Sequence, residues 1–194
     1  MRTLNYSLLL LGIFTLTGRP ALAAEPYFMH CYDFGCKSAV EIRYDEAQWS
    51  RIKKLFNQSL SMGEEKQAIR QAIAMMESYS GAISGTYRDK GGNYPGYDII
   101  KQLDCIDEST NTYQYLSALD ELELLSWHQV APKHRRIAWF ITHWTAAIVE
   151  KESGHQFAVD SWYRDNGEMP YLQPMDDWIS KRDFPIAFNP ELAG

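Results

Sequence analysis

Hydrophobic residues recur at helical spacing between residues 45 and 80, and each run follows a helix-start signal. Asp45 with Gln48, and Ser61 with Glu64, are the kind of residue pair that forms a capping box at a helix N-terminus. The pattern therefore predicts two amphipathic helices before residue 80. Their apolar positions are Trp49, Ile52, Leu55, Phe56 and Leu60 in the first helix and Ala68, Ile69, Ala72, Ile73, Met76 and Tyr79 in the second.

Glycine and proline interrupt this pattern from Gly81 to Gly96, a stretch with too many helix breakers for a regular element. We expect a long surface loop there, and the sequence leaves open whether it is a binding loop or a variable excursion. Apolar positions at helical spacing resume at Ile106 and continue to about Leu125. Cys105 therefore stands at or just before the N-terminus of a third predicted helix.

The hydrophobic pattern changes to a period of two after Pro132, where aromatic and β-branched residues become frequent. Residues 137–149 and 157–162 are the strand candidates, and Lys151–Gly154 would form the hairpin loop between them. The proline-rich tail is expected to be irregular, with a short helical turn near residues 175–179. The predicted fold class is α+β, with N-terminal helices and a helix, opened by a cysteine, that packs on an antiparallel β-sheet.

The first 23 residues differ from the rest of the chain. A basic start at Arg2, an apolar run over residues 8–16 and the small-x-small pattern Ala21-Leu22-Ala23 are typical of an export signal. We expect cleavage near Ala23, a single domain over residues 24–194 and a periplasmic or secreted location. The alternative is an uncleaved N-terminal anchor, although the apolar run is short for a helix that spans a bilayer.

Composition and charge narrow the classes of partner. The chain has 194 residues, of which 45% are hydrophobic and 23% charged, as in an ordinary globular domain, and its net charge is −6. Without a stripe of basic residues interleaved with aromatic ones, nucleic acid is not an expected partner. No segment approaches the roughly 18 uninterrupted apolar residues of a membrane span, so an integral membrane protein is not expected. We expect no cofactor, and the oligomeric state stays open.

Three cysteines, Cys31, Cys36 and Cys105, leave an odd thiol in an oxidising compartment. Cys31 and Cys36 are close enough to close a small loop, in which Gly35 eases the tight backbone, so we expect a disulfide between them. The alternative is a metal site formed by His30, Cys31 and Cys36, which lacks an obvious fourth ligand nearby. Under the disulfide prediction Cys105 is the free thiol.

Cys105 has the sequence position of an activated nucleophile. Unpaired backbone N–H groups and the positive end of the dipole at a helix N-terminus favour a thiolate over a thiol. A neighbouring imidazole would have to take the proton and later return it to the leaving group. The alternative for Cys105 is a buried, unreactive thiol.

The hairpin register points to His143 as that imidazole and to Asp160 as its partner. If Lys151–Gly154 closes the hairpin, Asp160 lies opposite Thr145. His143 and Asp160 are then diagonal neighbours on one face of the sheet, where the carboxylate can orient the imidazole ring. The alternatives are a histidine bonded to backbone and a structural carboxylate.

The same face carries the small side chains Thr145, Ala147 and Ala158. We expect these to let the helix of Cys105 pack closely over the sheet and present its sulfur to His143. The opposite face, with bulkier residues, would be buried against other elements. That opposite face carries Trp144, Ile148, Phe157 and Val159.

The order of these elements resembles the transglutaminase-like branch of the papain-type cysteine enzymes. The similarity covers about residues 98–162, and its most specific parts are Asp104-Cys105-Ile106-Asp107, His143-Trp144 and Val159-Asp160-Ser161-Trp162. The chain departs from the family pattern at Leu103 and Ser161, where glycine and proline are common. The resemblance implies a Cys-His-Asp triad on an α+β core, with Cys105 as nucleophile, His143 as general base and acid, and Asp160 as orienting carboxylate.

The function implied is that of an exported cysteine protease, amidase or acyltransferase. It would act on an amide or peptide bond of a peptide or protein substrate through a thioester on Cys105, with hydrolysis preferred over crosslinking. Gln102, beside the backbone N–H of Cys105, is a candidate oxyanion donor. The alternative is a catalytically silent domain of the same fold that binds a cell-envelope partner.

Overall fold

The computed structural model describes residues 25–56, 59–92, 100–138 and 141–180. The predicted export signal over residues 1–23 lies outside the described residues, as do part of the predicted Gly81–Gly96 loop and the tail beyond Ser180. The described elements, in chain order, are β1 (Tyr27–Tyr32), β2 (Ser38–Arg43), α1 (Glu46–Lys54), α2 (Met62–Ser84), α3 (Cys105–Glu121), β3 (His128–Ala138), β4 (Ile141–Glu150), β5 (Gln156–Asp160), β6 (Tyr171–Pro174) and α4 (Met175–Ser180).

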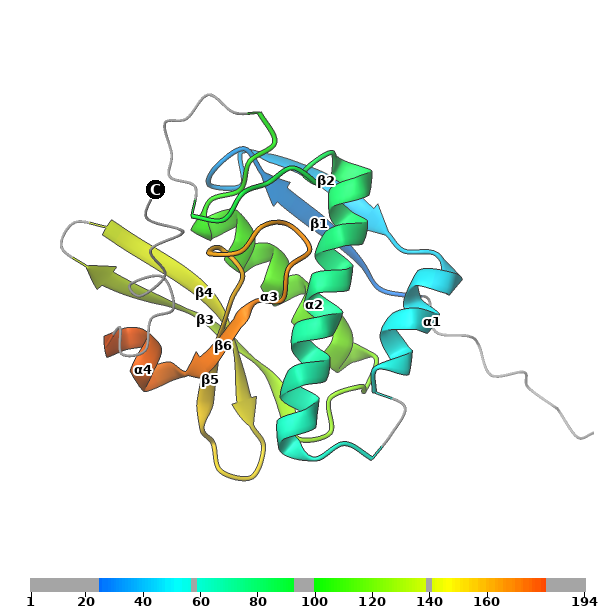
Figure 1. The fold of residues 1–194 in the computed structure, drawn as a ribbon, viewed down its shortest axis with the longest axis vertical. Helices are drawn as coiled ribbons and strands as arrows, with labels where there is room; N and C mark the ends of the chain where they lie inside the picture. Colours follow the sequence, from blue (N-terminus) through cyan, green and yellow to red (C-terminus); the bar gives the residue numbers. More distant parts are fainter. Residues whose placement is uncertain (1–24, 57–58, 93–99, 139–140, 181–194) are drawn as a thin grey trace, which may run out of the picture.

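A four-stranded antiparallel sheet with the strand order β3–β4–β5–β6 forms one layer of the described fold (Figure 1). The helix α3 packs on β3, β4 and β5 and also contacts β1 and α2, so it is the central helix of the molecule. The short helix α4 packs against β5 and β6. Two antiparallel sheets and four helices within the described residues agree with the predicted α+β class.

Both predicted capping boxes are present and begin the first two helices. Asp45 accepts a hydrogen bond from the backbone N–H of Gln48 at 2.7 Å, and the Gln48 side chain accepts one from the backbone N–H of Asp45 at 2.9 Å. Ser61 and Glu64 make the equivalent pair at the start of α2. Each box satisfies backbone N–H groups that have no partner within the helix.

The helix α2 continues to Ser84, past Gly81, where the sequence predicts a loop. A Cβ atom at Gly81 would lie 2.5 Å from the Asn166 side-chain oxygen, so the glycine permits close packing of another segment against the helix. The helix ends at Gly85, whose φ of 85° is the left-handed C-cap conformation that glycine adopts without strain. The predicted loop therefore starts four residues too early.

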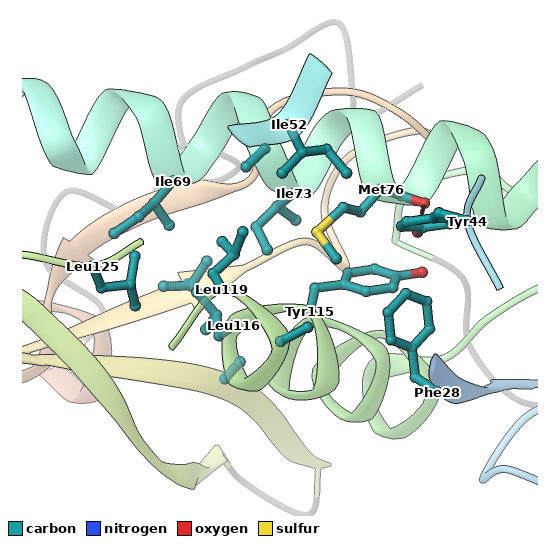
Figure 2. Packing of buried hydrophobic residues seen from close by; sticks show 14 of the residues in the cluster. Phe28, Tyr44, Ile52, Ile69, Ile73, Met76, Tyr115, Leu116, Leu119 and Leu125 are labelled. Atoms are coloured by element: carbon teal, nitrogen blue, oxygen red, sulfur yellow. Dashed lines mark hydrogen bonds between the residues drawn. The ribbon is translucent and has the colours of Figure 1, made fainter. Parts of the chain in front are cut away.

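The main hydrophobic core lies between α2, α3 and one face of the four-stranded sheet. Figure 2 shows side chains from α2 facing side chains from α3, with Phe28 of β1 at one end of the cluster. The apolar positions that predicted α2 are the ones that face inward. Fully buried members of this core include Ile69, Ile73 and Met76 of α2 and Tyr115, Leu116 and Leu119 of α3.

None of the helices in the described part of the chain combines the length and the hydrophobicity that a membrane span requires.

The sequence predicts helices alone in the N-terminal part. The structure adds an antiparallel hairpin of β1 and β2 before α1. Side chains of α3 hydrogen-bond the backbone of β1: Asn111 contacts Cys31 at 2.7 and 2.9 Å, and Gln114 contacts Met29 at 2.9 and 2.8 Å. These side-chain amides satisfy backbone N–H and C=O groups along the edge of β1 that does not pair with β2. The strand is stabilised by residues about 80 positions away, which no local pattern shows.

The sheet also has two strands that the sequence analysis misses. β3 is an edge strand whose polar residues and Pro132 hide its pattern, and Pro132 lies in a bulge, where a strand tolerates the missing N–H group. β6 lies in the tail that we expected to be irregular, and it pairs with β5 over four residues. The predicted helical turn near residues 175–179 is present as α4.

The hairpin between β4 and β5 has the predicted register. Ala146 pairs with Val159 and Ala147 with Ala158, and the backbone N–H of Glu150 donates to the carbonyl of His155 at 2.9 Å. The Lys151–Gly154 loop therefore closes the hairpin as expected, and it places His143 and Asp160 on the same face.

The prediction of which face receives α3 is wrong. The face with Ala146, Ile148 and Val159 joins the core formed with α2 and α3. The face with Ala147 and Ala158 packs on Met175 and Trp178 of α4. The larger apolar side chains decide the packing, because they bury more surface against the long helix than small ones can.

Candidate active site

Cys105 is the first residue of α3, as the sequence predicts. Its preceding residue, Asp104, caps the helix and accepts hydrogen bonds from the backbone N–H groups of Ile106 and Asp107 at 2.9 and 3.0 Å. Asp107 completes a capping box by accepting from the Asp104 backbone N–H at 3.2 Å. The box fixes the first turn of the helix, and Cys105 is partly exposed at its start.

The sulfur of Cys105 lies against the backbone of β4. It donates toward the carbonyl of Thr142 at 3.8 Å and receives a hydrogen bond from the backbone N–H of Trp144. The pairing with β5 ends at Ala146, so these backbone groups face an edge of β4 that none of the described strands covers. The sulfur therefore lies at this edge and contacts the backbone groups of the two residues that flank His143.

The structure brings His143 and Asp160 together. The Nε2 atom of His143 lies 2.7 Å from the Oδ2 atom of Asp160, and both side chains are buried. A carboxylate at this distance fixes the orientation of the imidazole ring. The same-face prediction for these two residues is therefore confirmed, whereas their catalytic roles remain predictions.

Trp178 is a site residue that the sequence analysis missed. Its indole Nε1 donates a hydrogen bond to the same Asp160 oxygen at 2.7 Å. The backbone carbonyl of Trp178 in turn accepts a hydrogen bond from Arg136, the residue opposite His143 in β3. The only local signal was a tryptophan in a predicted helical turn, which does not indicate contact with a strand of the sheet.

Aromatic rings surround the His143 imidazole. The ring centroids of Trp162, Tyr163 and Trp178 lie 4.9, 5.0 and 5.5 Å from that of His143. The Tyr163 hydroxyl accepts a hydrogen bond from Arg136 at 3.0 Å, which ties this ring to β3. These contacts hold the imidazole in one orientation and keep its hydrogen bond with Asp160 away from water. Such a bond is stronger in the low dielectric of a protein interior than in water.

The second nitrogen of the His143 ring is available. Nδ1 is buried and has no hydrogen-bond partner among the described residues, and no hydrogen bond joins it to Cys105. Because Nε2 is held by Asp160, Nδ1 is the nitrogen that can exchange a proton with a nearby group. The imidazole projects from the α4 side of β4, so its path to the sulfur passes around the uncovered edge of that strand.

Burial raises the pKa of the Cys105 thiol to about 11. The hydrogen bond from the Trp144 backbone N–H acts in the opposite direction, and the negative charges of Asp104 and Asp160 raise the pKa further. The thiol is therefore neutral at pH 7 in this structure. Any reaction through the sulfur requires a base that removes its proton as the bond to substrate forms.

Gln102, the candidate oxyanion donor, contacts the segment before it. Its side-chain Nε2 donates to the Arg88 carbonyl at 3.1 Å, and its Oε1 accepts from the Lys90 backbone N–H at 3.1 Å. These hydrogen bonds hold residues 88–90 beside the irregular segment that precedes Cys105. The structure thus gives Gln102 a tethering role, and its role toward an oxyanion stays a prediction.

A groove of about 570 Å³ lies along this tethered segment. Its lining combines apolar and cationic side chains with the amide of Gln102, three positions before Cys105. The lining residues include Tyr87, Ile100, Arg88, Lys90 and Lys101.

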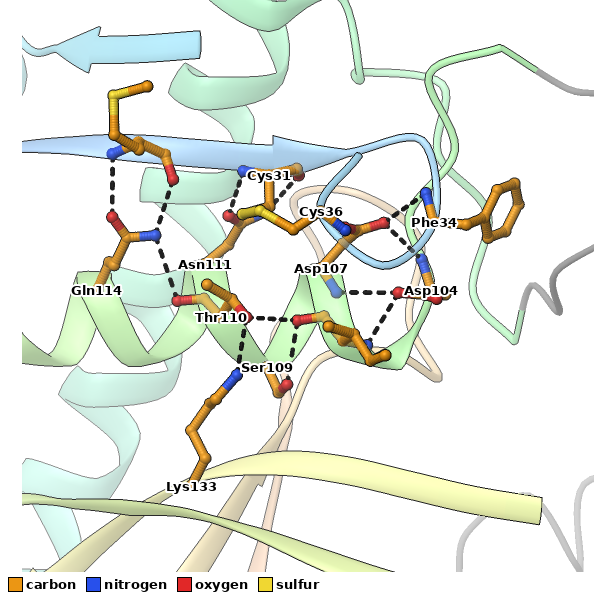
Figure 3. The surroundings of a disulfide bond; sticks show 12 residues. Cys31, Phe34, Cys36, Asp104, Asp107, Ser109, Thr110, Asn111, Gln114 and Lys133 are labelled. Carbon is orange, nitrogen blue, oxygen red and sulfur yellow. Dashed lines mark hydrogen bonds between the residues drawn. A yellow bond between two sulfur atoms is a disulfide. The ribbon is translucent and has the colours of Figure 1, made fainter. Parts of the chain in front are cut away.

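The predicted disulfide joins Cys31 and Cys36, whose Cα atoms are 4.6 Å apart (Figure 3). The loop that it closes is held against the start of α3, because Asp107 accepts hydrogen bonds from the backbone N–H groups of Phe34 and Cys36 at 2.9 and 2.5 Å. Burial and the charge of Asp104 raise the pKa of Asp107 to about 6. The disulfide loop and the helix start that carries Cys105 therefore form one connected unit.

The alternative metal site is not supported. Both sulfurs of Cys31 and Cys36 are used in the disulfide, so neither is free to bind a metal as a thiolate. His30 points into the core, where its ring nitrogens contact Tyr115 and Thr86 at 3.1 Å each, and burial lowers its pKa to about 4. Within the described residues, no group of three or more His, Cys, Asp or Glu side chains is arranged to hold a metal ion.

Comparison with known proteins gives no relative. The chain matches no protein-family model, no curated protein and no solved structure. The assignment of function therefore depends on the residues and geometry described above.

Proposed function

We propose that this protein is a cysteine-dependent acyl-transfer enzyme that acts on amide or peptide bonds, with Cys105 as nucleophile and water as acceptor. The observation that carries the proposal is the buried pair of His143 and Asp160, together with a sulfur at a helix start that contacts the backbone on either side of His143. An imidazole fixed through one nitrogen and unpaired at the other is the arrangement that general base catalysis needs.

The proposed reaction has two halves. In the first, His143 Nδ1 takes the thiol proton while the Cys105 sulfur attacks the substrate carbonyl, and the same proton passes to the leaving amine as the carbon–nitrogen bond breaks. In the second, His143 takes a proton from water, whose oxygen attacks the thioester, and the same proton passes to the Cys105 sulfur as the carbon–sulfur bond breaks, which releases a carboxylic acid and restores the thiol. Asp160 stabilises the imidazolium that forms in each half.

The helix start supplies the electrostatic part of this reaction. The backbone N–H of Cys105 contacts its own sulfur, which makes it the first donor available to the oxyanion that develops on the attacked carbonyl. The dipole of α3 has its positive end at the same place, so it favours negative charge on both the sulfur and the oxyanion.

A peptide or protein is the proposed substrate. The groove of about 570 Å³, lined by residues of the 85–90 and 100–102 segments, combines apolar surface with hydrogen-bonding and cationic groups. Export through the N-terminal segment belongs to the same proposal. The Cys31–Cys36 disulfide supports it, because such bonds persist in oxidising compartments.

A second candidate is a catalytically silent domain that binds a cell-envelope partner. The neutral Cys105 thiol and the lack of a hydrogen bond between it and His143 favour this candidate. The two candidates differ in one measurable property, the reactivity of Cys105.

Alkylation with iodoacetamide over a pH series measures that property, because Cys31 and Cys36 are joined and Cys105 is the remaining cysteine. For the enzyme, we expect alkylation at pH 7 to be slower in H143A than in the wild-type protein and its midpoint to be higher, because His143 assists removal of the thiol proton. C105S gives the unlabelled baseline. The same alkylation rate and midpoint in the wild-type protein and H143A would refute the proposed function and favour the silent domain.

A further inference from the structure

We propose that Lys133 is a positioning residue whose ammonium group stabilises negative charge on the Cys105 sulfur. This inference rests on the proposed function and adds to it a residue outside the Cys-His-Asp set.

A β-bulge directs Lys133 toward α3. Ala131 pairs with Ala147 and His134 with Thr145, so Pro132 and Lys133 of β3 together face one residue of β4. Such a bulge changes the direction in which a side chain leaves a strand, and bulges are frequent beside active sites. Here it turns the Lys133 side chain to the helix that begins with Cys105, as Figure 3 shows.

The ammonium group of Lys133 is held at that helix by a specific contact. Its Nζ atom donates to the Thr110 hydroxyl at 2.8 Å, and this hydroxyl in turn donates to the Ile106 carbonyl at 2.6 Å. Ile106 directly follows Cys105, so the cation is docked on the first turns of α3. The Trp144 ring, whose backbone N–H contacts the sulfur, lies 5.6 Å from the same Nζ atom.

This cation offsets an otherwise acidic surrounding. Each packed element contributes a group: the Asp104 cap of α3, Lys133 of β3, His143 of β4 and Asp160 of β5. Asp104 and Asp160 disfavour a thiolate. Lys133 acts in the opposite sense, since a negative Cys105 favours the charged form of Lys133, and the interaction is reciprocal. The Lys133 ammonium is partly buried, which lowers its pKa. A charge in such a site of lower dielectric interacts more strongly with its neighbours than it would in water.

Substitution of Lys133 tests the inference through the thiol rather than through folding. In K133M we expect the midpoint of Cys105 alkylation to rise by about one pH unit, which slows alkylation about tenfold below the midpoint. K133R should restore most of the rate. Added salt should reduce the difference between K133M and the wild-type protein, because the interaction is electrostatic.

Lys66 provides a matched control. It is also partly buried, it lies over the Phe157 ring at 3.7 Å and it pairs with Glu150 at 2.9 Å, so its removal has comparable structural consequences away from Cys105. K66M should leave the alkylation midpoint unchanged. T110V, which removes the acceptor that docks the ammonium, should shift the midpoint in the same direction as K133M but less.

The outcomes separate this inference from the proposed function. If H143A raises the midpoint but K133M, folded by circular dichroism, does not, Lys133 only tethers β3 to α3 and the inference is wrong while the enzyme proposal stands. If neither variant changes the midpoint, both are wrong. A shift in K66M as large as in K133M would also overturn the inference, since the effect would then be a general one.

Discussion

The hydrogen bond from Trp178 to Asp160 can be tested by a substitution that removes its donor group and little else. W178F removes the indole N–H and keeps an aromatic ring beside the His143 imidazole. The bond is 2.7 Å long, and its acceptor is the buried oxygen that also holds His143. A hydrogen bond to a charged group contributes about 1.5–3 kcal/mol to stability. For a domain of this size, about 2–4 °C of Tm per kcal/mol gives an expected loss of roughly 3–12 °C.

Trp49 supplies the control for this measurement. It is as buried as Trp178, at 1% exposure each, but its indole nitrogen has no hydrogen-bond partner in the described part of the chain. W49F therefore carries the same change in side-chain volume without losing a hydrogen bond. The difference in Tm between the two variants therefore measures the contribution of the hydrogen bond to Asp160.

The assay combines thermal unfolding with Cys105 alkylation. We expect W178F to unfold at a lower temperature than W49F and to show slower alkylation at pH 7, because a less firmly held Asp160 orients His143 poorly. W49F should leave the alkylation rate unchanged. If W178F is no less stable than W49F and alkylates at the wild-type rate, Trp178 does not support the His143–Asp160 pair.

Two further predictions concern stability. Burial raises the pKa of Glu77 to about 8 from 4.5, so between these pH values the folded chain keeps a proton that the unfolded chain releases, and stability falls as pH rises through that window. E77Q should flatten the decrease, as urea unfolding at pH 5 and pH 8 would measure; a wild-type slope in E77Q contradicts this. G63A should raise the Tm and G81A lower it. The reason is that a Cβ at Gly63 meets open space on a helix, whereas one at Gly81 collides with a neighbouring side chain; the opposite order would refute the packing argument.

Features that depend on near neighbours were predictable from the sequence. The capping boxes of α1 and α2 involve residues three positions apart, so their patterns are visible in the chain. The register of the β4–β5 hairpin follows from the length of one loop, and it was enough to place His143 and Asp160 on a common face.

Features that depend on distant segments were not predictable. β1 is held by Asn111 and Gln114, and β3 is an edge strand with a proline in its bulge, so neither has the alternating pattern of a half-buried strand. Alanines occur on both faces of β4, at Ala146 and Ala147, and small residues alone cannot decide which face receives the long helix. Trp178 reaches Asp160 from a separate helix across 18 positions.

The placement of α3 changes how the site must work. Because α3 packs on one face of β4 and His143 projects from the other, the proposed proton transfer between sulfur and imidazole has to pass around the edge of β4 that the described strands leave uncovered. The pairing of β5 stops at Ala146, which leaves the Trp144 N–H and the Thr142 carbonyl to Cys105. Had the ladder continued, strand backbone would occupy the place of the sulfur. The early end of β5 therefore creates the candidate site, and Asp160, the last residue of β5, lies at the point where the strand leaves the sheet.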